Sequence, residues 1–179
     1  MDHDDHVNLL KPANLNLGGT WADFGAGGGA FTLALRELIG TSAIIYAVDK
    51  DRARLNELEQ VYRARFGDSQ NLHILAADFS RTIELPSLDG IVMANSLHFF
   101  KDKEKILRQV RTHLNPNGIL LLVEYNVDSG NSWVPHPLTF ESFRELTPRA
   151  GFSEPRLLGK HPSSFLREFY SAATYKQRP

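Results

Sequence analysis

The chain alternates short hydrophobic runs with amphipathic stretches from residue 20 to residue 125. The hydrophobic runs are rich in β-branched residues and predict strands, while apolar residues at helical spacing predict the helices between them. This order is typical of βαβ units in a parallel sheet that is covered on both faces. We expect strands at 20–24, 44–48, 72–76, 91–94 and 119–125, and helices at 31–39, 51–66 and 103–114.

The pattern changes after residue 125. Residues 126–137 are rich in Gly, Ser, Asn and Pro and predict a loop. Thr139 is a suitable cap for a helix that ends before Gly151. Strand-like pieces follow at 156–158 and 169–175, and no long crossover helix separates them. We therefore expect this last pair of strands to be antiparallel.

Composition and charge narrow the classes of function. The chain has 179 residues, of which 42% are hydrophobic, so we expect a single domain over 1–179. Residues 1–19 precede the first strand, and we expect them either to be mobile or to fold over the site. Lys and Arg total 20 against 21 Asp and Glu, so no basic excess marks a surface for nucleic acid.

Several chemistries are excluded at this level. The absence of cysteine excludes disulfides, thiolate catalysis and cysteine-based zinc sites. No cluster of oxygen ligands suits a hard cation, so we expect no metal. No apolar run approaches the roughly 20 residues of a membrane span. The start of the chain is acidic, unlike a signal peptide, and we expect a cytoplasmic protein without a membrane partner.

Residues 25–30, with the sequence GAGGGA, form a glycine-rich turn between the first predicted strand and the first helix. Such a turn lets a ligand approach the backbone closely and presents the amide groups of a helix N-terminus. Enzymes that bind dinucleotides share this pattern, and a plain strand-to-helix turn is the alternative.

Asp23 favours one class of ligand over another. It lies near the end of the first predicted strand, two residues before Gly25. A pyrophosphate at that place faces a carboxylate at short range, which is electrostatically unfavourable. S-adenosylmethionine (AdoMet) carries a sulfonium and an ammonium group instead, and a carboxylate suits it. The alternative is that Asp23 accepts backbone hydrogen bonds within the turn.

Two further carboxylates end the second and third predicted strands. Asp49 lies at the spacing from Gly25 at which an acidic residue binds the ribose hydroxyls of a nucleoside. The alternative is a solvated aspartate or one that caps the next helix, a role that Asp51 also suits. Asp78 can accept from an adenine amino group while Phe79 covers the ring, or both are ordinary loop and core residues. Ligands of open α/β sheets bind at the edge where these three strands end.

Together these motifs resemble the class I AdoMet-dependent methyltransferases over nearly the whole chain. Asn117 stands where the family has the first glycine of its last motif, and asparagine tolerates left-handed backbone geometry. The segments that carry the resemblance are WADFGAGGG at 21–29, YAVD at 46–49, AAD at 76–78, DGIVMANSLH at 89–98 and LNPNGILLLVE at 114–124.

The resemblance implies a Rossmann-like, doubly wound α/β sheet of seven strands, mostly parallel, with an antiparallel C-terminal hairpin. It implies AdoMet as cofactor, with S-adenosylhomocysteine as product. The methionine part lies at Asp23 and the glycine turn, the ribose at Asp49, the adenine at Asp78, and the sulfonium beside Asn95. The cofactor-contacting residues that we expect are Asp23, Gly25, Ala26, Gly27, Asp49, Lys50, Asp78, Phe79, Asn95 and Ser96.

The methyl acceptor is less clearly marked than the cofactor. His98 follows the fourth predicted strand at a position that faces the methyl group in the family. It is a candidate general base, and a structural histidine that caps the loop is the alternative. Glu124 and Tyr125, at the end of the fifth strand, are expected near the same pocket. Trp133, His136 and Phe140, from the loop and helix over it, form either an aromatic wall or ordinary core packing.

These observations predict transfer of the AdoMet methyl group to an O, N, C or S atom of a small molecule. The alternatives are an NAD(P)-binding oxidoreductase, an RNA or protein methyltransferase, and a non-catalytic AdoMet-binding relative. Asp23 argues against the first, the near-neutral charge against RNA, and the intact glycine turn against the last. The short loop after residue 125 leaves a pocket that is shallow, completed by the partner in a homodimer, or open to a large substrate.

Overall fold

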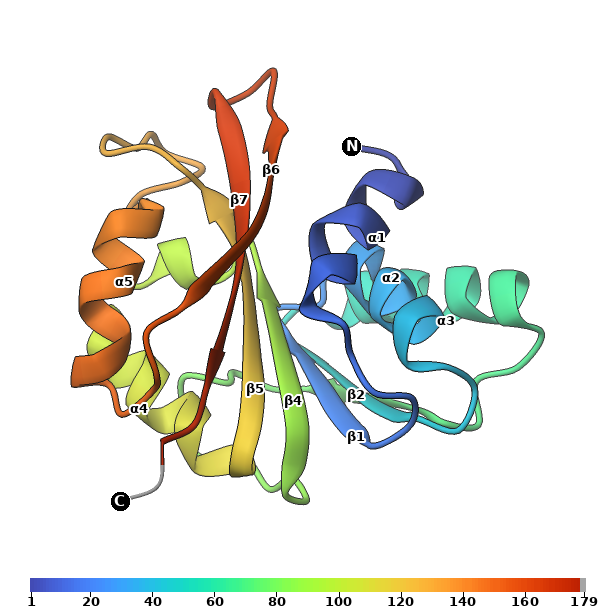
Figure 1. The fold of residues 1–179 in the computed structure, drawn as a ribbon. Helices are drawn as coiled ribbons and strands as arrows, with labels where there is room; N and C mark the ends of the chain where they lie inside the picture. The colour runs from blue at the N-terminus through green and yellow to red at the C-terminus, as the bar shows by residue number, and fades with distance from the viewer. Residues whose placement is uncertain (178–179) are drawn as a thin grey trace.

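The computed structural model describes residues 1–177. These residues form one sheet of seven strands in the order β3-β2-β1-β4-β5-β7-β6 (Figure 1). Strands β1 to β5 are mutually parallel, and β7 runs antiparallel to both β5 and β6. The predicted doubly wound fold with an antiparallel C-terminal hairpin is therefore confirmed. The strands are β1 (Thr20–Phe24), β2 (Ile44–Asp49), β3 (Leu72–Ala76), β4 (Leu88–Ala94), β5 (Leu114–Tyr125), β6 (Arg156–Pro162) and β7 (Glu168–Tyr175).

Helices cover both faces of the sheet. Figure 1 shows α1, α2 and α3 on one face and α4 and α5 on the other. Two short 3₁₀ turns complete the set, at Lys11–Ala13 and Leu97–Phe99. Within residues 1–177, no helix is both long enough and apolar enough to cross a membrane. The helices are α1 (His3–Leu10), α2 (Ala30–Ile39), α3 (Arg52–Phe66), α4 (Lys103–His113) and α5 (Phe140–Arg149).

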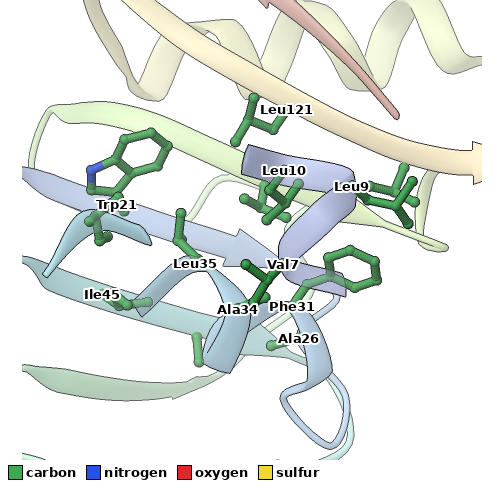
Figure 2. Packing of buried hydrophobic residues seen from close by; sticks show 14 of the residues in the cluster. Val7, Leu9, Leu10, Trp21, Ala26, Phe31, Ala34, Leu35, Ile45 and Leu121 are labelled. Atoms are coloured by element: carbon green, nitrogen blue, oxygen red, sulfur yellow. The ribbon is translucent and has the colours of Figure 1, made fainter. Parts of the chain in front are cut away.

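The N-terminal segment, for which two states were predicted, is an ordered helix. Asp2 caps α1, and its side chain and that of Asp5 accept hydrogen bonds from each other's backbone amides. Val7, Leu9 and Leu10 are buried in the hydrophobic cluster that also contains α2 residues (Figure 2). Because this apolar contact is made with distant parts of the chain, the helix is held by tertiary packing.

The junction between α4 and β5 differs from the prediction. The sequence predicted a helix through residue 114 and a turn at 115–118, but α4 ends at His113 and β5 begins at Leu114. Leu114 pairs with Leu88 and Ile119 with Gly90, so the residues between them form a bulge. Asn117 has a φ of 64° there, the left-handed geometry expected of a residue that replaces glycine.

Candidate functional site

The glycine turn joins the end of β1 to the start of α2. The amides of Gly25 and Ala26 both donate to the Val48 carbonyl, at 2.8 and 3.1 Å. Gly25 has a φ of +84°, and a Cβ added there would lie 2.5 Å from the Cβ of Ser96. At Gly27, with a φ of +50°, an added Cβ would meet nothing within 4 Å. The turn is thus tightly packed at Gly25 and open at Gly27, where a ligand can approach the backbone.

Asp49 connects the end of β2 to this turn. Its Oδ2 accepts from the Gly27 amide and its Oδ1 from the Asp51 amide, both at 2.9 Å. Asp51 caps α3, accepting from the amides of Ala53 and Arg54. The helix-capping alternative for Asp49 is therefore wrong, since Asp51 fills that role.

Asp23 is almost completely buried, with 1% of its surface exposed. The Thr32 hydroxyl of α2 donates to its Oδ2 at 2.6 Å. No backbone amide among residues 1–177 donates to it, so the backbone-bonded alternative does not hold. Burial raises the pKa of Asp23 to about 7, the charge of Asp49 adds to this, and the Thr32 hydrogen bond opposes it. A nearby cation would favour its ionised form.

Asp78, at the end of β3, has the opposite environment. Its Oδ1 accepts from the hydroxyl and the amide of Ser80, at 2.6 and 3.0 Å, and Arg81 lies 3.7 Å from Oδ2. The Ser80 hydrogen bonds, followed by the charge of Arg81, hold the pKa of Asp78 below its usual value. The ionised form of Asp78 is therefore favoured in the larger cavity that it lines.

Two adjoining cavities lie at the carboxyl ends of these strands, with volumes of about 540 and about 440 Å³. They share Gly25, Arg54, Ala94 and Asn95, and so lie on either side of the glycine turn. Every residue expected to contact the cofactor lines one or both. Those in the larger cavity are Gly25, Gly27, Asp49, Lys50, Asp78, Phe79, Asn95 and Ser96, and the smaller one adds Asp23 and Ala26.

The floor of the larger cavity contains packed core side chains and one hydrogen-bond acceptor without a partner among residues 1–177. Phe79 stacks on Phe24 with ring centroids 5.3 Å apart, so it is a core residue as well as a lining one. The Ser96 hydroxyl donates to the Phe24 carbonyl at 2.7 Å. Asn95 has a φ of 53°, and its Oδ1 is buried without a hydrogen-bond partner in residues 1–177. A buried acceptor without a partner is costly unless a ligand supplies the donor.

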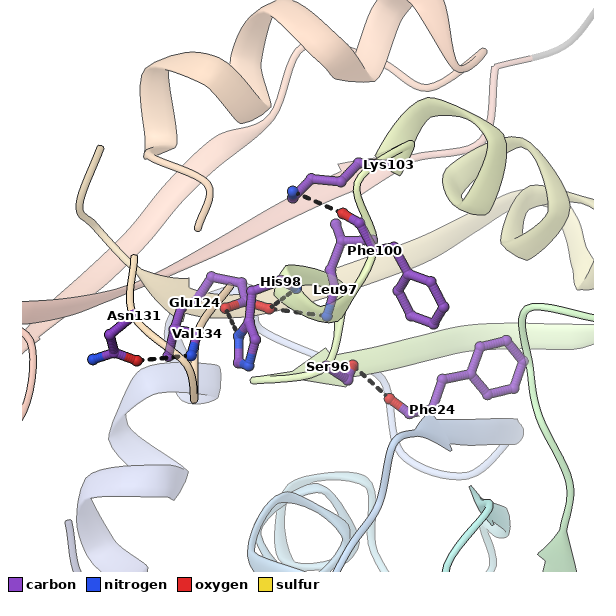
Figure 3. Close-up of polar contacts among 9 residues, drawn as sticks. All are labelled: Phe24, Ser96, Leu97, His98, Phe100, Lys103, Glu124, Asn131 and Val134. Carbon is purple, nitrogen blue, oxygen red and sulfur yellow. Dashed lines mark hydrogen bonds and ion pairs between the residues drawn. The ribbon is translucent and has the colours of Figure 1, made fainter. Parts of the chain in front are cut away.

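His98 and Glu124 form a buried pair (Figure 3), and neither residue lines the two cavities. Glu124 is the penultimate residue of β5 and has none of its surface exposed, and its Oε2 lies 2.7 Å from Nδ1 of His98. Its Oε1 accepts from the amides of Leu97 and His98, at 2.9 and 3.1 Å. The carboxyl group thus fixes both the backbone and the ring of His98.

This pattern sets the tautomer of His98. A carboxylate can only accept hydrogen bonds, so beside Glu124 the Nδ1 atom carries the proton and donates it. In the neutral ring, Nε2 then carries a lone pair. Nε2 has no hydrogen-bond partner in the part of the chain that the structure describes. The arrangement is that of a histidine base oriented by an acidic residue.

The comparison with protein families shows to which family the chain belongs. A model described as a methyltransferase domain matches residues 22–120, which include the glycine turn and the ends of β1 to β4. The chain belongs to this family. The resemblance to class I AdoMet-dependent methyltransferases is confirmed, and the oxidoreductase alternative is wrong.

Individual relatives agree with the family. The methyltransferase domain is 36% identical to carboxy-S-adenosyl-L-methionine synthase of Shewanella amazonensis over 105 residues, which cover 57% of this chain and 42% of the relative. It is 30% identical to acetylserotonin O-methyltransferase of Mus musculus over 160 residues, covering 75% of this chain and 39% of the relative. The chain thus spans less than half the length of these relatives.

The fold also matches solved structures. YcgJ protein from Bacillus subtilis superposes with a TM-score of 0.78 at 14% identity, covering 99% of this chain and 100% of that one. At this identity the match concerns the fold alone.

The predicted acceptor residues are less closely grouped than the cofactor residues. Tyr125 ends β5, packs against Phe169 at 4.2 Å and lies 6.3 Å from His98, ring centroid to ring centroid. The His136 amide donates to the His98 carbonyl at 3.0 Å. Trp133 is 74% exposed, which excludes core packing. Phe140 packs edge-on against Tyr170 and belongs to the core side.

Some residues around the site were not predicted from the sequence. His6 lines the smaller cavity, Phe99 and Phe100 line the larger one, and Arg54 lines both. The spacing of Asp2 and Asp5 was the one signal for α1, and thus for His6, because it fits a capping box. The contact between Glu124 and His98 joins segments that are 26 residues apart, and no local pattern encodes it.

Proposed function

We propose that this chain transfers the methyl group of AdoMet to a small-molecule acceptor, and that His98 takes up the proton of that acceptor. The observation that carries the proposal is the ring of carboxylates and open backbone around the two cavities. Three carboxyl groups and a glycine turn suit a ligand that combines a nucleoside with positive charge.

The described residues fit AdoMet at several atoms. Asn95 Oδ1 lacks a donor inside the protein, and the backbone at Gly27 has room for a neighbouring ligand atom. In our proposal Asp23 and the turn hold the methionine part, Asp49 with Lys50 the ribose, and Asp78 with Phe79 the adenine. AdoMet would supply a methyl group bound to a cationic sulfur, a reactive donor that needs no metal.

The protein's own contribution is alignment, exclusion of water and movement of one proton. Glu124 keeps the proton of His98 on Nδ1, so Nε2 can accept the proton that an acceptor hydroxyl loses. The charge that develops on the imidazole is then balanced by the Glu124 carboxylate. His98 is only 2% exposed, so its surroundings must open for an acceptor to reach Nε2.

Calorimetry tests the donor half of the proposal. AdoMet and S-adenosylhomocysteine should bind, and NAD should not. Binding of NAD without binding of AdoMet would overturn the proposal. Incubation with methyl-labelled AdoMet and cell extract, followed by fractionation, should then place the label on a small molecule. Label found only on RNA or protein would contradict the small-molecule part.

We propose small molecules as acceptors because the formal net charge is −1 and no basic excess suits RNA. We also propose that the chain forms a homodimer and that it is located in the cytoplasm. Sedimentation equilibrium of the purified chain tests the homodimer, which should give twice the monomer mass. Cell fractionation tests the location.

A further inference from the structure

Helix α1 brings a histidine to the methionine end of the cofactor site. His6 lines the smaller cavity together with Asp23, Gly25 and Asn95. Its ring packs edge-on against Phe31, near the start of α2, with centroids 4.8 Å apart. The His6 side chain, from α1, therefore lies next to α2, the helix that follows the glycine turn.

Asp23 alone does not match both charges of the ligand expected in this cavity. The methionine part of AdoMet carries an ammonium and a carboxylate, and Asp23 suits only the ammonium. The side chains lining this cavity that can carry positive charge are His6 and Arg54, within residues 1–177. Arg54 lies on α3, pairs with Glu57 at 3.3 Å and also lines the larger cavity. His6 belongs to the smaller cavity alone.

We infer that His6 binds the α-carboxylate of the cofactor, so that α1 is part of the cofactor site. This inference rests on the proposed function, because it concerns the same ligand. His6 would complement Asp23, each holding one of the two charges of the amino-acid group.

The position of His6 is well fixed by the rest of α1. Nε2 of His3 lies 2.8 Å from Glu37 of α2, and Nε2 of His161 of β6 lies 3.1 Å from Asp5. The buried residues of α1 add apolar contacts with the hydrophobic cluster that contains α2 residues. A residue on a helix that is held by side-chain contacts and apolar packing is preorganised, which lowers the entropic cost of binding.

Protonation of His6 follows from its neighbours. Burial lowers the pKa of His6, and the nearby charges of the terminal amine and His3 lower it further, whereas Asp5 and Asp2 raise it. The facing residue on α2 is Phe31, which carries no charge. A bound carboxylate favours the protonated ring, so ligand binding through His6 should be accompanied by proton uptake.

A matched pair of ligands isolates the carboxylate. AdoMet and decarboxylated AdoMet share the sulfonium, the ammonium and the nucleoside, and differ by one carboxylate. Calorimetric titration of the wild type, His6→Ala and His6→Gln with both ligands measures the contribution of His6 to that group alone. Asn8→Ala is the control variant, because Asn8 is an exposed residue of the same helix.

We expect the wild type to prefer AdoMet over decarboxylated AdoMet. His6→Ala should weaken AdoMet binding by about 10- to 100-fold and leave decarboxylated AdoMet unchanged. His6→Gln, which keeps an N–H donor, should recover part of the loss, and Asn8→Ala should match the wild type with both ligands.

Other outcomes separate the possible failures. Equal weakening of both ligands by His6→Ala would overturn the inference, because it would show a displaced helix and not a lost carboxylate contact. Unchanged AdoMet affinity would overturn it as well. A wild type that binds neither ligand would instead contradict the proposed function.

Discussion

Asp23 and Glu124 are two almost completely buried carboxyl groups in different regions of the same sheet. Asp23, on the proposed cofactor side, has 1% of its surface exposed and accepts one hydrogen bond, from Thr32. Glu124, on the proposed acceptor side, is fully buried and has hydrogen-bond contacts with two amides and the His98 ring. Burial alone therefore does not decide how a carboxyl group is used.

The two carboxyl groups differ in where their hydrogen-bond donors come from. The hydrogen bonds of Glu124 are all made within the protein, and they hold His98 in place. Asp23 has few protein donors, and its pKa is raised to about 7 by burial. In the proposed function a cationic ligand supplies what Asp23 lacks. The proposed cofactor side would then be completed by its ligand, whereas the proposed acceptor side is already satisfied within the protein and must open.

Glu124→Gln tests the acceptor side and should have the largest effect. The glutamine oxygen can still accept from the Leu97 and His98 amides, but its NH₂ group faces Nδ1 and forces the proton to Nε2. His98 is then no longer a base, and kcat should fall by about 10²- to 10⁴-fold. Steady-state kinetics measure this once an acceptor is identified. AdoMet affinity should not change, and an unaltered kcat would show that His98 is structural.

Gly25→Ala tests the close packing on the cofactor side. The added Cβ meets the Cβ of Ser96 at 2.5 Å and the φ is +84°, so the free energy of unfolding should fall by about 3 kcal/mol. Gly67→Ala is the control, since Gly67 has a φ of +85° but open space around it. It should cost about 1 kcal/mol. Equal losses in urea denaturation would show that contact with Ser96 is unimportant.

Asp49→Ala removes an oxygen pair between the glycine turn and the ribose position. It should weaken AdoMet binding by about 1–3 kcal/mol, because charge-assisted hydrogen bonds are lost. Calorimetry on variants with unchanged circular dichroism measures this. An unchanged affinity in a folded protein would remove Asp49 from the cofactor site.

The pH dependence of binding tests Asp23. Below about pH 7 its carboxyl group is neutral, so AdoMet affinity should fall by up to about tenfold per pH unit on acidification. Asp23→Asn should bind more weakly at pH 8 and lack this dependence. Titrations between about pH 8 and about pH 6 measure both variants. The same slope in Asp23→Asn would assign the dependence to another group.

The same shift has a consequence for the ligand-free protein. The pKa of Asp23 in the folded chain is about 7, above the ordinary 3.8 of an unfolded aspartate. The folded state therefore keeps a proton that the unfolded chain loses. The contribution of Asp23 to the free energy of unfolding is largest below about pH 4 and declines as the pH rises to about 7.

The strand ends on the cofactor side were predictable because their chemistry is local. Strands β1 and β3 have the predicted bounds, and Asp23, Asp49 and Asp78 lie at or next to strand ends. A backbone that must turn tightly after a strand requires glycine, and carboxylates at parallel strand ends converge without further information. This is why short motifs were sufficient there.

The remaining features depend on contacts between distant residues. Helix α1 contains few apolar residues, and it is held by packing that its own sequence does not show. The pairing of Glu124 with His98 arises only when β4 and β5 lie side by side. The exposure of Trp133 follows from the path of an irregular loop, for which periodicity gives no guidance.

The place of β7 in the sheet has a consequence for the order in which the chain is made. Strand β7 lies between β5 and β6, and Glu124 pairs with Tyr170 of β7. Residues 1–96 carry every expected cofactor contact, and they leave the ribosome long before residue 170 does. In a growing chain the residues of the proposed cofactor site are therefore made while the free edge of β5 still awaits β7, so this site can begin to form before the Glu124–His98 region is enclosed.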